Sequence, residues 1–118
     1  MGARLLIELP FPAKPLWPNG RAHWAVKARE TKKHRAWAYG ATLQKRLPPP
    51  PGRVNVSLTI HPKTAHAIDA DNAVASCKAY LDGIAQALGV NDSTFNAPSV
   101  FYGLPIKGGK VIIELEAA

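Results

Sequence analysis

The segment VNVSLTIH, residues 54–61, is the clearest indicator of the fold. Apolar Val54, Val56, Leu58 and Ile60 alternate with polar residues. This two-residue period places one side of a strand against a core and the other side toward solvent. The segment therefore predicts a β-strand that belongs to a sheet with one covered face.

Three further segments are predicted to form strands. Residues 4–9 alternate in the same way as residues 54–61. Residues 100–104 and 110–116 are expected to pair as a hairpin through the Lys-Gly-Gly sequence at 107–109, because glycines accept the backbone angles of tight turns.

Two helices complete the predicted elements. The first is expected from about His23 to Leu47, and the four prolines at 48–51 end it because proline cannot continue the helical hydrogen bonds. The second is expected from about Asp71 to Leu88, and Gly89 supplies its end. The apolar stripe of this second helix consists of Val74, Cys77, Leu81, Ile84 and Leu88.

The order β-α-β-α-β-β predicts an α+β fold in which two helices pack on a mixed sheet. At 118 residues, the chain is expected to form a single domain over residues 1–118. A single cysteine, Cys77, excludes an internal disulfide, and its place in the apolar stripe predicts a buried structural thiol. Because no apolar run approaches the roughly 18 residues of a membrane span, we expect a cytoplasmic protein without a membrane partner.

The charge of the chain indicates an anionic partner. The chain contains fifteen Lys and Arg residues and eight Asp and Glu residues, which gives a formal net charge of +7. Nucleic acid is the first candidate for such a partner. The residues expected to bind DNA lie in and just before the first helix: Arg21, Lys27, Arg29, Lys32, Lys33 and Arg35.

The few carboxylates gather where a loop enters the second helix. Asp69, Asp71 and Asn72 lie at that junction, and Asp92 follows the same helix. Oxygen ligands of this kind suit Mg²⁺, whose shell a substrate phosphate can complete. The alternative is that Asp69 or Asp71 only caps the helix.

Lys78 is predicted to join this cluster. It follows Asp71 by seven residues, close to two helical turns, and therefore projects from nearly the same face. A lysine at this place could hold the scissile phosphate or stabilise charge in the transition state. Asp82, one turn later, could pair with Lys78 and orient it.

The histidines and tryptophans leave more than one interpretation open. His66 flanks the acidic loop and could assist a metal ion or a leaving group, whereas His34 lies among basic residues and is expected to contact phosphate or solvent. Trp17 and Trp24 could wedge against unpaired bases, and core packing is the alternative for at least one of them.

The acidic segment and its surroundings resemble the RusA family of Holliday-junction resolvases, and phage-type members in particular. The resemblance rests on Asp69-Ala70-Asp71-Asn72, Lys78, Leu81-Asp82-Gly83-Ile84, Asn91-Asp92, and a proline-rich opening made of Leu9-Pro10-Phe11-Pro12 and Trp17-Pro18-Asn19-Gly20-Arg21. The stretch Arg21-Ala22-His23-Trp24 is similar to phage-type members in particular. Some members carry the lysine where this chain has Ala75, and many have two adjacent aspartates where this chain has Asn91-Asp92. The resemblance implies that Asp69, Asp71 and Asp92 bind the metal ion and that Lys78 is catalytic.

The acidic cluster and Lys78 predict a metal-dependent phosphodiesterase. The resemblance implies an endodeoxyribonuclease that resolves Holliday junctions or other branched DNA in recombination and repair. Mg²⁺ is the expected cofactor, with Mn²⁺ as a substitute, and no small-molecule cofactor is expected. The expected assembly is a homodimer of bacterial or phage origin. Two alternatives stay open: a non-catalytic basic nucleic-acid-binding protein, and a flap or RNA nuclease that uses the same acidic site.

Overall fold

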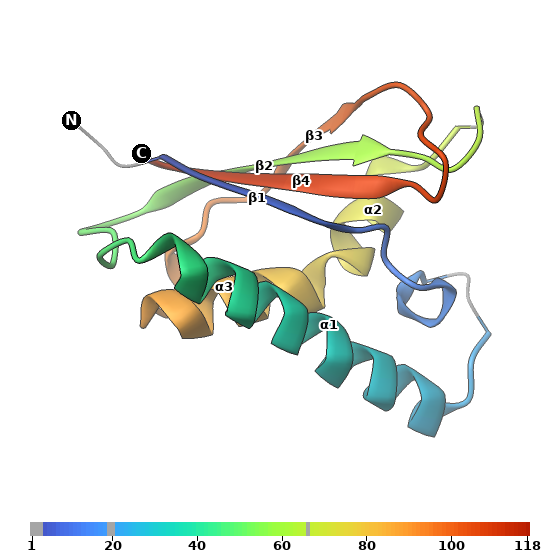
Figure 1. Ribbon diagram of the computed structural model, residues 1–118, viewed down its shortest axis with the longest axis horizontal. Helices are drawn as coiled ribbons and strands as arrows, with labels where there is room; N and C mark the ends of the chain where they lie inside the picture. Colours follow the sequence, from blue (N-terminus) through green and yellow to red (C-terminus); the bar gives the residue numbers. More distant parts are fainter. Residues whose placement is uncertain (1–3, 19–20, 66) are drawn as a thin grey trace.

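The computed structural model describes residues 4–18, 21–65 and 67–118 (Figure 1). None of the helices in these residues has the length and apolar character that crossing a membrane requires. The elements, in chain order, are β1 (Arg4–Pro10), η1 (Lys14–Leu16), α1 (Trp24–Lys45), β2 (Val54–His61), α2 (Ala70–Ser76), α3 (Lys78–Leu88), η2 (Asp92–Thr94), β3 (Ser99–Tyr102) and β4 (Lys110–Ala117).

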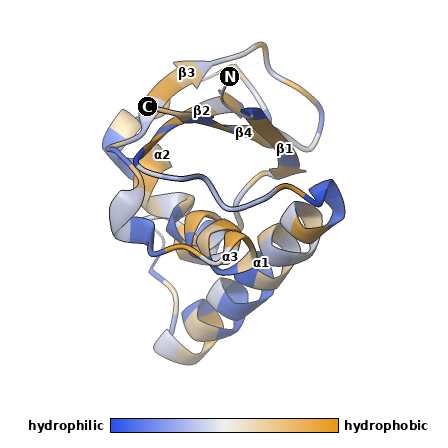
Figure 2. Ribbon diagram, turned by 90° about the vertical axis from the view of Figure 1, so that its left-hand side faces the viewer, coloured by the Kyte–Doolittle hydropathy of each residue, from blue (hydrophilic) through white to orange (hydrophobic). Residues whose placement is uncertain are grey.

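The strands form one four-stranded mixed sheet in the order β1-β4-β2-β3. β4 is antiparallel to both β1 and β2, whereas the short edge strand β3 is parallel to β2. The helices lie together on one side of this sheet, so the protein has a sheet layer and a helix layer (Figures 1 and 2). This arrangement confirms the predicted α+β fold.

The core lies between the two layers and follows from the strand alternation. The register places Ile7 beside Ile113 and Ile113 beside Leu58, and all three side chains are buried. Tyr80 and Ile84 of α3 are fully buried in the same core. Burying each large apolar side chain contributes roughly 1.5–3 kcal/mol, so these rows account for much of the folding energy.

The predicted hairpin of residues 100–104 and 110–116 is wrong. β3 pairs only with β2, and β4 lies between β1 and β2 in the interior of the sheet. Gly108 and Gly109 do form a turn with positive φ angles of 80° and 67°. After that turn, β4 runs between β1 and β2 and not beside β3. In this interior position Val111 and Ile113 pair with a strand on each side, and their side chains are buried.

The predicted second helix is two helices, α2 and α3, which meet at Cys77. The Ser76 hydroxyl donates to the Ala73 carbonyl at 2.7 Å, and the Cys77 N–H contacts the carbonyls of both Ala73 (3.2 Å) and Val74 (3.1 Å). The serine hydroxyl competes with backbone N–H groups for a helix carbonyl, and the Cys77 N–H shifts from a carbonyl four residues back toward one three residues back. Both features interrupt a regular helix. The Cys77 side chain is buried, as expected, and burial raises the pKa of its thiol to about 12.

His34 lies in the core and not on the phosphate-facing surface, so that prediction is wrong. Its side chain is 1% exposed and packs against Trp37 and Tyr80. Its Nε2 accepts the backbone N–H of Ala13 at 3.1 Å, and its Nδ1 lies 2.7 Å from the Glu30 carbonyl oxygen. Burial lowers the pKa of this imidazole, which therefore stays neutral and fixes the loop after β1 to α1.

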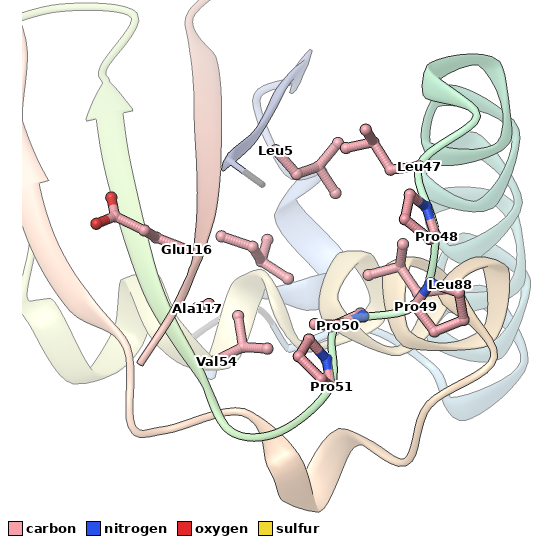
Figure 3. Close-up of a pocket in the computed structure, with 11 residues that line it drawn as sticks. Leu5, Leu47, Pro48, Pro49, Pro50, Pro51, Val54, Leu88, Glu116 and Ala117 are labelled. Carbon is pink, nitrogen blue, oxygen red and sulfur yellow. The ribbon is translucent and has the colours of Figure 1, made fainter. Parts of the chain in front are cut away.

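The four prolines at 48–51 lie in the connection from α1 to β2. Pro48 to Pro51 form one wall of an apolar hollow of about 470 Å³ between the helix layer and the end of the sheet (Figure 3). Leu5, Leu47 and Leu88 line the same hollow. The connector thus keeps the end of α1 beside the end of α3.

The crossing of α1 and α3 depends on the absence of a side chain at Gly83. A Cβ atom there would lie 2.3 Å from the carbonyl oxygen of Arg35, whereas one at Gly40 of α1 would meet nothing within 4 Å. We expect Gly83→Ala to lower the free energy of unfolding by about 1–3 kcal/mol, because the two helices must separate. Gly40→Ala should raise it by about 0.5–1 kcal/mol, because alanine favours the helix.

Urea unfolding of the two variants measures both changes. If both substitutions changed the free energy of unfolding by the same amount, the packing of α1 against α3 would not depend on the missing side chain at Gly83.

Candidate active site

Asp69 ends the loop after β2 and begins α2. Its Oδ1 accepts the backbone N–H groups of Asp71 (2.8 Å) and Asn72 (3.3 Å), which makes Asp69 the N-cap. The Tyr102 hydroxyl donates to the Ile68 carbonyl at 2.7 Å and ties this loop to the end of β3. The capping interpretation therefore describes Asp69, while the Asp71 side chain is exposed in the first turn.

Lys78 lies between two carboxylates at the beginning of α3. Its Nζ donates to Oδ1 of Asp82 at 2.8 Å and to Oδ2 of Asp92 at 3.0 Å. Asp82 is one turn further along α3, and Asp92 begins η2 after the helix has ended. The predicted pairing of Lys78 with Asp82 is thus observed, and the fold adds Asp92 to it. The break at Cys77 overturns the expected two-turn spacing on one continuous helix.

The contacts fix the charges of these groups. Hydrogen bonds to Asp82 and then to Asp92 raise the pKa of the Lys78 ammonium. The hydrogen bond from Lys78 and its positive charge hold the pKa of the Asp92 carboxyl below its usual value. The Lys78 and Asp92 side chains are 64% and 47% exposed. Solvent screens such exposed ion pairs, so a substrate can displace this lysine at small cost.

The predicted metal ligands are suitable in kind but are not gathered around one point. Asp69, Asp71 and Asp92 offer exposed carboxylate oxygens, which Mg²⁺ prefers. In residues 4–18, 21–65 and 67–118, no group of three or more His, Cys, Asp or Glu side chains is placed to hold one metal ion. Oδ1 of Asp69 is held by the α2 backbone and Oδ2 of Asp92 by Lys78. Mg²⁺ at these carboxylates stays a prediction.

The accessory residues occupy different places. Asn72 lines a hollow between the β1–α1 loop and the β2–α2 loop, together with Asp69. His66 lies outside the described residues. His61, at the end of β2, places Nδ1 2.9 Å from the Leu104 carbonyl oxygen, and its ring fills the space beside Gly103.

The basic residues predicted to bind DNA are all exposed. They lie on and just before α1: Arg21, Lys27, Arg29, Lys32, Lys33 and Arg35. Lys27 also lines a hollow of about 270 Å³ that it shares with Lys78 and Asp82. The basic helix therefore adjoins the lysine between the two carboxylates.

The sequence reasoning missed two lysines beside Asp69. Lys14 of η1 and Lys63 of the loop after β2 line the same hollow as Asp69 and Asn72. Neither belongs to a motif, and they are 49 positions apart in the sequence. Only the fold places them on one hollow, so no local signal could have identified them.

Fold and site together define an α+β protein with an exposed lysine between two aspartates, next to a basic helix. The chain is 32% identical over 115 residues to an uncharacterized protein of Xylella fastidiosa (strain Temecula1 / ATCC 700964), a match that covers 92% of this chain and 74% of that protein. The chain belongs to the same family as that protein. No model of a known protein family matches the sequence.

The contact between Lys78 and Asp92 is open to direct measurement. We expect Lys78→Met to raise the pKa of Asp92 toward its ordinary value, because the variant loses both the hydrogen bond and the positive charge. A carboxyl pKa that is lowered in the folded state stabilises the protein above the unfolded pKa, and this contribution is lost as the pH falls through the folded pKa. As the pH falls through the pKa of Asp92, the free energy of unfolding of Lys78→Met should therefore decrease less than that of the native chain.

Carbon-detected NMR titration of the Asp92 carboxyl group gives its pKa. The matched control is Asp82→Asn, which keeps Lys78 and should keep the pKa of Asp92 below its usual value. An unchanged Asp92 titration in Lys78→Met would contradict the observed contact.

Proposed function

We propose that this chain is a Mg²⁺-dependent endonuclease that cuts branched DNA, in the manner implied by its resemblance to the RusA resolvases. The contact of Lys78 with Asp92 carries the proposal. The resemblance assigns both residues to one catalytic site, although 14 positions separate them in the sequence. Their contact at 3.0 Å supports a common role.

The acidic cluster and Lys78 would have separate roles in cleavage. Exposed Asp69, Asp71 and Asp92 would hold the metal ion through their carboxylate oxygens. Bound Mg²⁺ would supply positive charge that polarises the phosphodiester and favours deprotonation of a water. The Lys78 ammonium would donate to a phosphate oxygen and stabilise the negative charge that develops there. Asp82 would keep the lysine in position through its contact at 2.8 Å.

The basic surface of α1 supports DNA as the substrate. Exposed lysines and arginines there can neutralise phosphates. Within the described residues, Lys33 alone among them has an acidic partner, Glu30 at 3.5 Å. Lys27 shares a hollow with Lys78, so a strand that follows the helix would reach the proposed catalytic lysine. A purely binding protein would gain nothing from carboxylates beside this basic surface.

We further propose that the chain acts as a C2 homodimer, since resolving a four-way junction needs two symmetric nicks and each chain has one such site. β3 is an edge strand, and its Phe101 and Tyr102 side chains are exposed. Its unpaired backbone groups and these aromatic side chains are suited to a dimer interface. Residues 111–113 offer no such edge, because β4 is an interior strand. We expect sedimentation to show a dimer with junction DNA. A strict monomer that still makes paired nicks would refute the dimer.

The aspartate variants test the nuclease proposal. We expect Asp69→Asn, Asp71→Asn and Asp92→Asn each to abolish cleavage of a labelled four-way junction in Mg²⁺, because each loses a metal ligand. DNA binding should persist or tighten, because a negative charge near the phosphates is removed. Glu8→Gln, a matched loss of charge on the uncovered face of the sheet, should cut normally.

Gel assays with the junction and a linear duplex, in Mg²⁺ and in EDTA, measure both properties. Full cleavage by one aspartate variant removes that residue from the site. Binding without any cleavage by the native chain favours the non-catalytic alternative, and equal cutting of flaps or RNA assigns another substrate shape.

A further inference from the structure

The hollow lined by Asp69 and Asn72 has no part in the cleavage step proposed above beyond the carboxylate of Asp69. It measures about 410 Å³ and lies between the β1–α1 loop and the β2–α2 loop. We call it the Phe11–Trp17 pocket, and its lining residues include Phe11, Lys14, Trp17, Lys63, Asp69 and Asn72. Its volume is within the roughly 300–1,000 Å³ of pockets that hold small ligands.

The aromatic wall of this pocket is held rigidly. The rings of Phe11 and Trp17 stack at a centroid distance of 5.3 Å and an interplanar angle of 20°. Trp17 Nε1–H donates to the Pro12 carbonyl at 3.0 Å, and the Phe11 ring lies so close to Gly109 that a Cβ there would be 2.9 Å away. The buried His34 fixes the same loop through the N–H of Ala13. A preformed wall binds a flat ligand without first being ordered.

The polar groups of the pocket match the parts of a nucleotide. Lys14 and Lys63 are exposed, and each can donate to a phosphate. In the described part of the chain the side-chain amide of Asn72 makes no hydrogen bond, so its donor and acceptor can meet the edge of a base. Lys63 Nζ lies 5.6 Å from the centroid of the Phe11 ring, which is stacked on Trp17. The lysine therefore lies beside an apolar aromatic lining on which a base can stack. Two positive charges against Asp69 alone favour an anionic ligand.

We propose that the Phe11–Trp17 pocket holds one unpaired nucleotide of a DNA strand, with the base on the aromatic wall and its phosphate at Lys14 and Lys63. A base inside a duplex is paired and stacked and must lose both interactions before it can enter the pocket, whereas an unpaired base at a branch enters at little cost. The pocket would thus select branched DNA and present the strand next to Asp69. This inference rests on the proposed action on DNA and names the feature of the substrate that is recognised.

The test compares the binding of two duplexes in EDTA, so that no metal-dependent step contributes. One duplex is fully paired, and the other has a single unpaired nucleotide. We expect the native chain to bind the second roughly tenfold more tightly, about 1.4 kcal/mol, since the unpaired base can stack on an aromatic side chain. The double variant Lys14→Gln/Lys63→Gln should lose most of this preference. The matched control Lys32→Gln/Lys33→Gln should weaken both complexes and keep their ratio.

A second readout follows Trp17 itself. Trp24 and Trp37 are exposed and can be replaced by phenylalanine, which leaves Trp17 as the remaining tryptophan. Its fluorescence should be quenched by the unpaired nucleotide and not by the paired duplex. Equal quenching by both duplexes, or an unchanged preference in the Lys14/Lys63 variant, would overturn the pocket assignment.

Two further outcomes separate this inference from the function on which it rests. Cleavage of junctions without any preference for unpaired nucleotides would overturn the pocket and leave the nuclease intact. Thymidine monophosphate that quenches Trp17 at the same concentration as the duplex with the unpaired nucleotide would assign the pocket to free nucleotides and overturn its role for a DNA strand. Failure to bind any DNA would overturn both proposals.

Discussion

The close crossing of α1 and α3 at Gly83 is the constraint on which the rest of the structure depends. α3 crosses α1 in the helix layer on one side of the sheet, and most of its residues are buried. Without a side chain at Gly83, the helix approaches the Arg35 carbonyl of α1 directly. The Tyr80 hydroxyl donates to the Pro10 carbonyl at 2.6 Å and fixes the same helix to the end of β1. These two contacts fix the position of α3, and with it the position of its first residue, Lys78.

Elements that depend on local sequence could be predicted. The alternation in residues 54–61 defines β2 with its observed bounds, because one covered sheet face requires a two-residue period. α1 begins and ends within two residues of the prediction, and the prolines explain its end. The sheet order could not be predicted in this way. Nothing in residues 110–116 distinguishes a hairpin partner of β3 from an interior strand between β1 and β2, since either place buries alternate side chains.

Other failures have the same origin in distant partners. His34 looked like part of a basic surface because its sequence neighbours are charged, but its Nε2 meets the N–H of Ala13, 21 positions earlier. The pairing of Lys78 with Asp82 was predictable, because one helical turn joins them, whereas the contact with Asp92 needs the chain to turn back after Gly89. Lys14 and Lys63 line one hollow only because of the fold, and no local sequence pattern marks either of them.

The charges around α3 explain why an exposed lysine can be both fixed and available. Two carboxylates hold the Lys78 ammonium and keep it protonated, and either one alone would leave it in contact with a negative charge. A phosphate oxygen that approaches can replace one carboxylate as acceptor, so the lysine keeps a partner throughout and loses little energy in an exposed site. Asp82 is the natural partner to remain, because the same helix carries both side chains. Release of Asp92 from the lysine would then free a carboxylate beside the bound phosphate, which is where the proposed nuclease requires one.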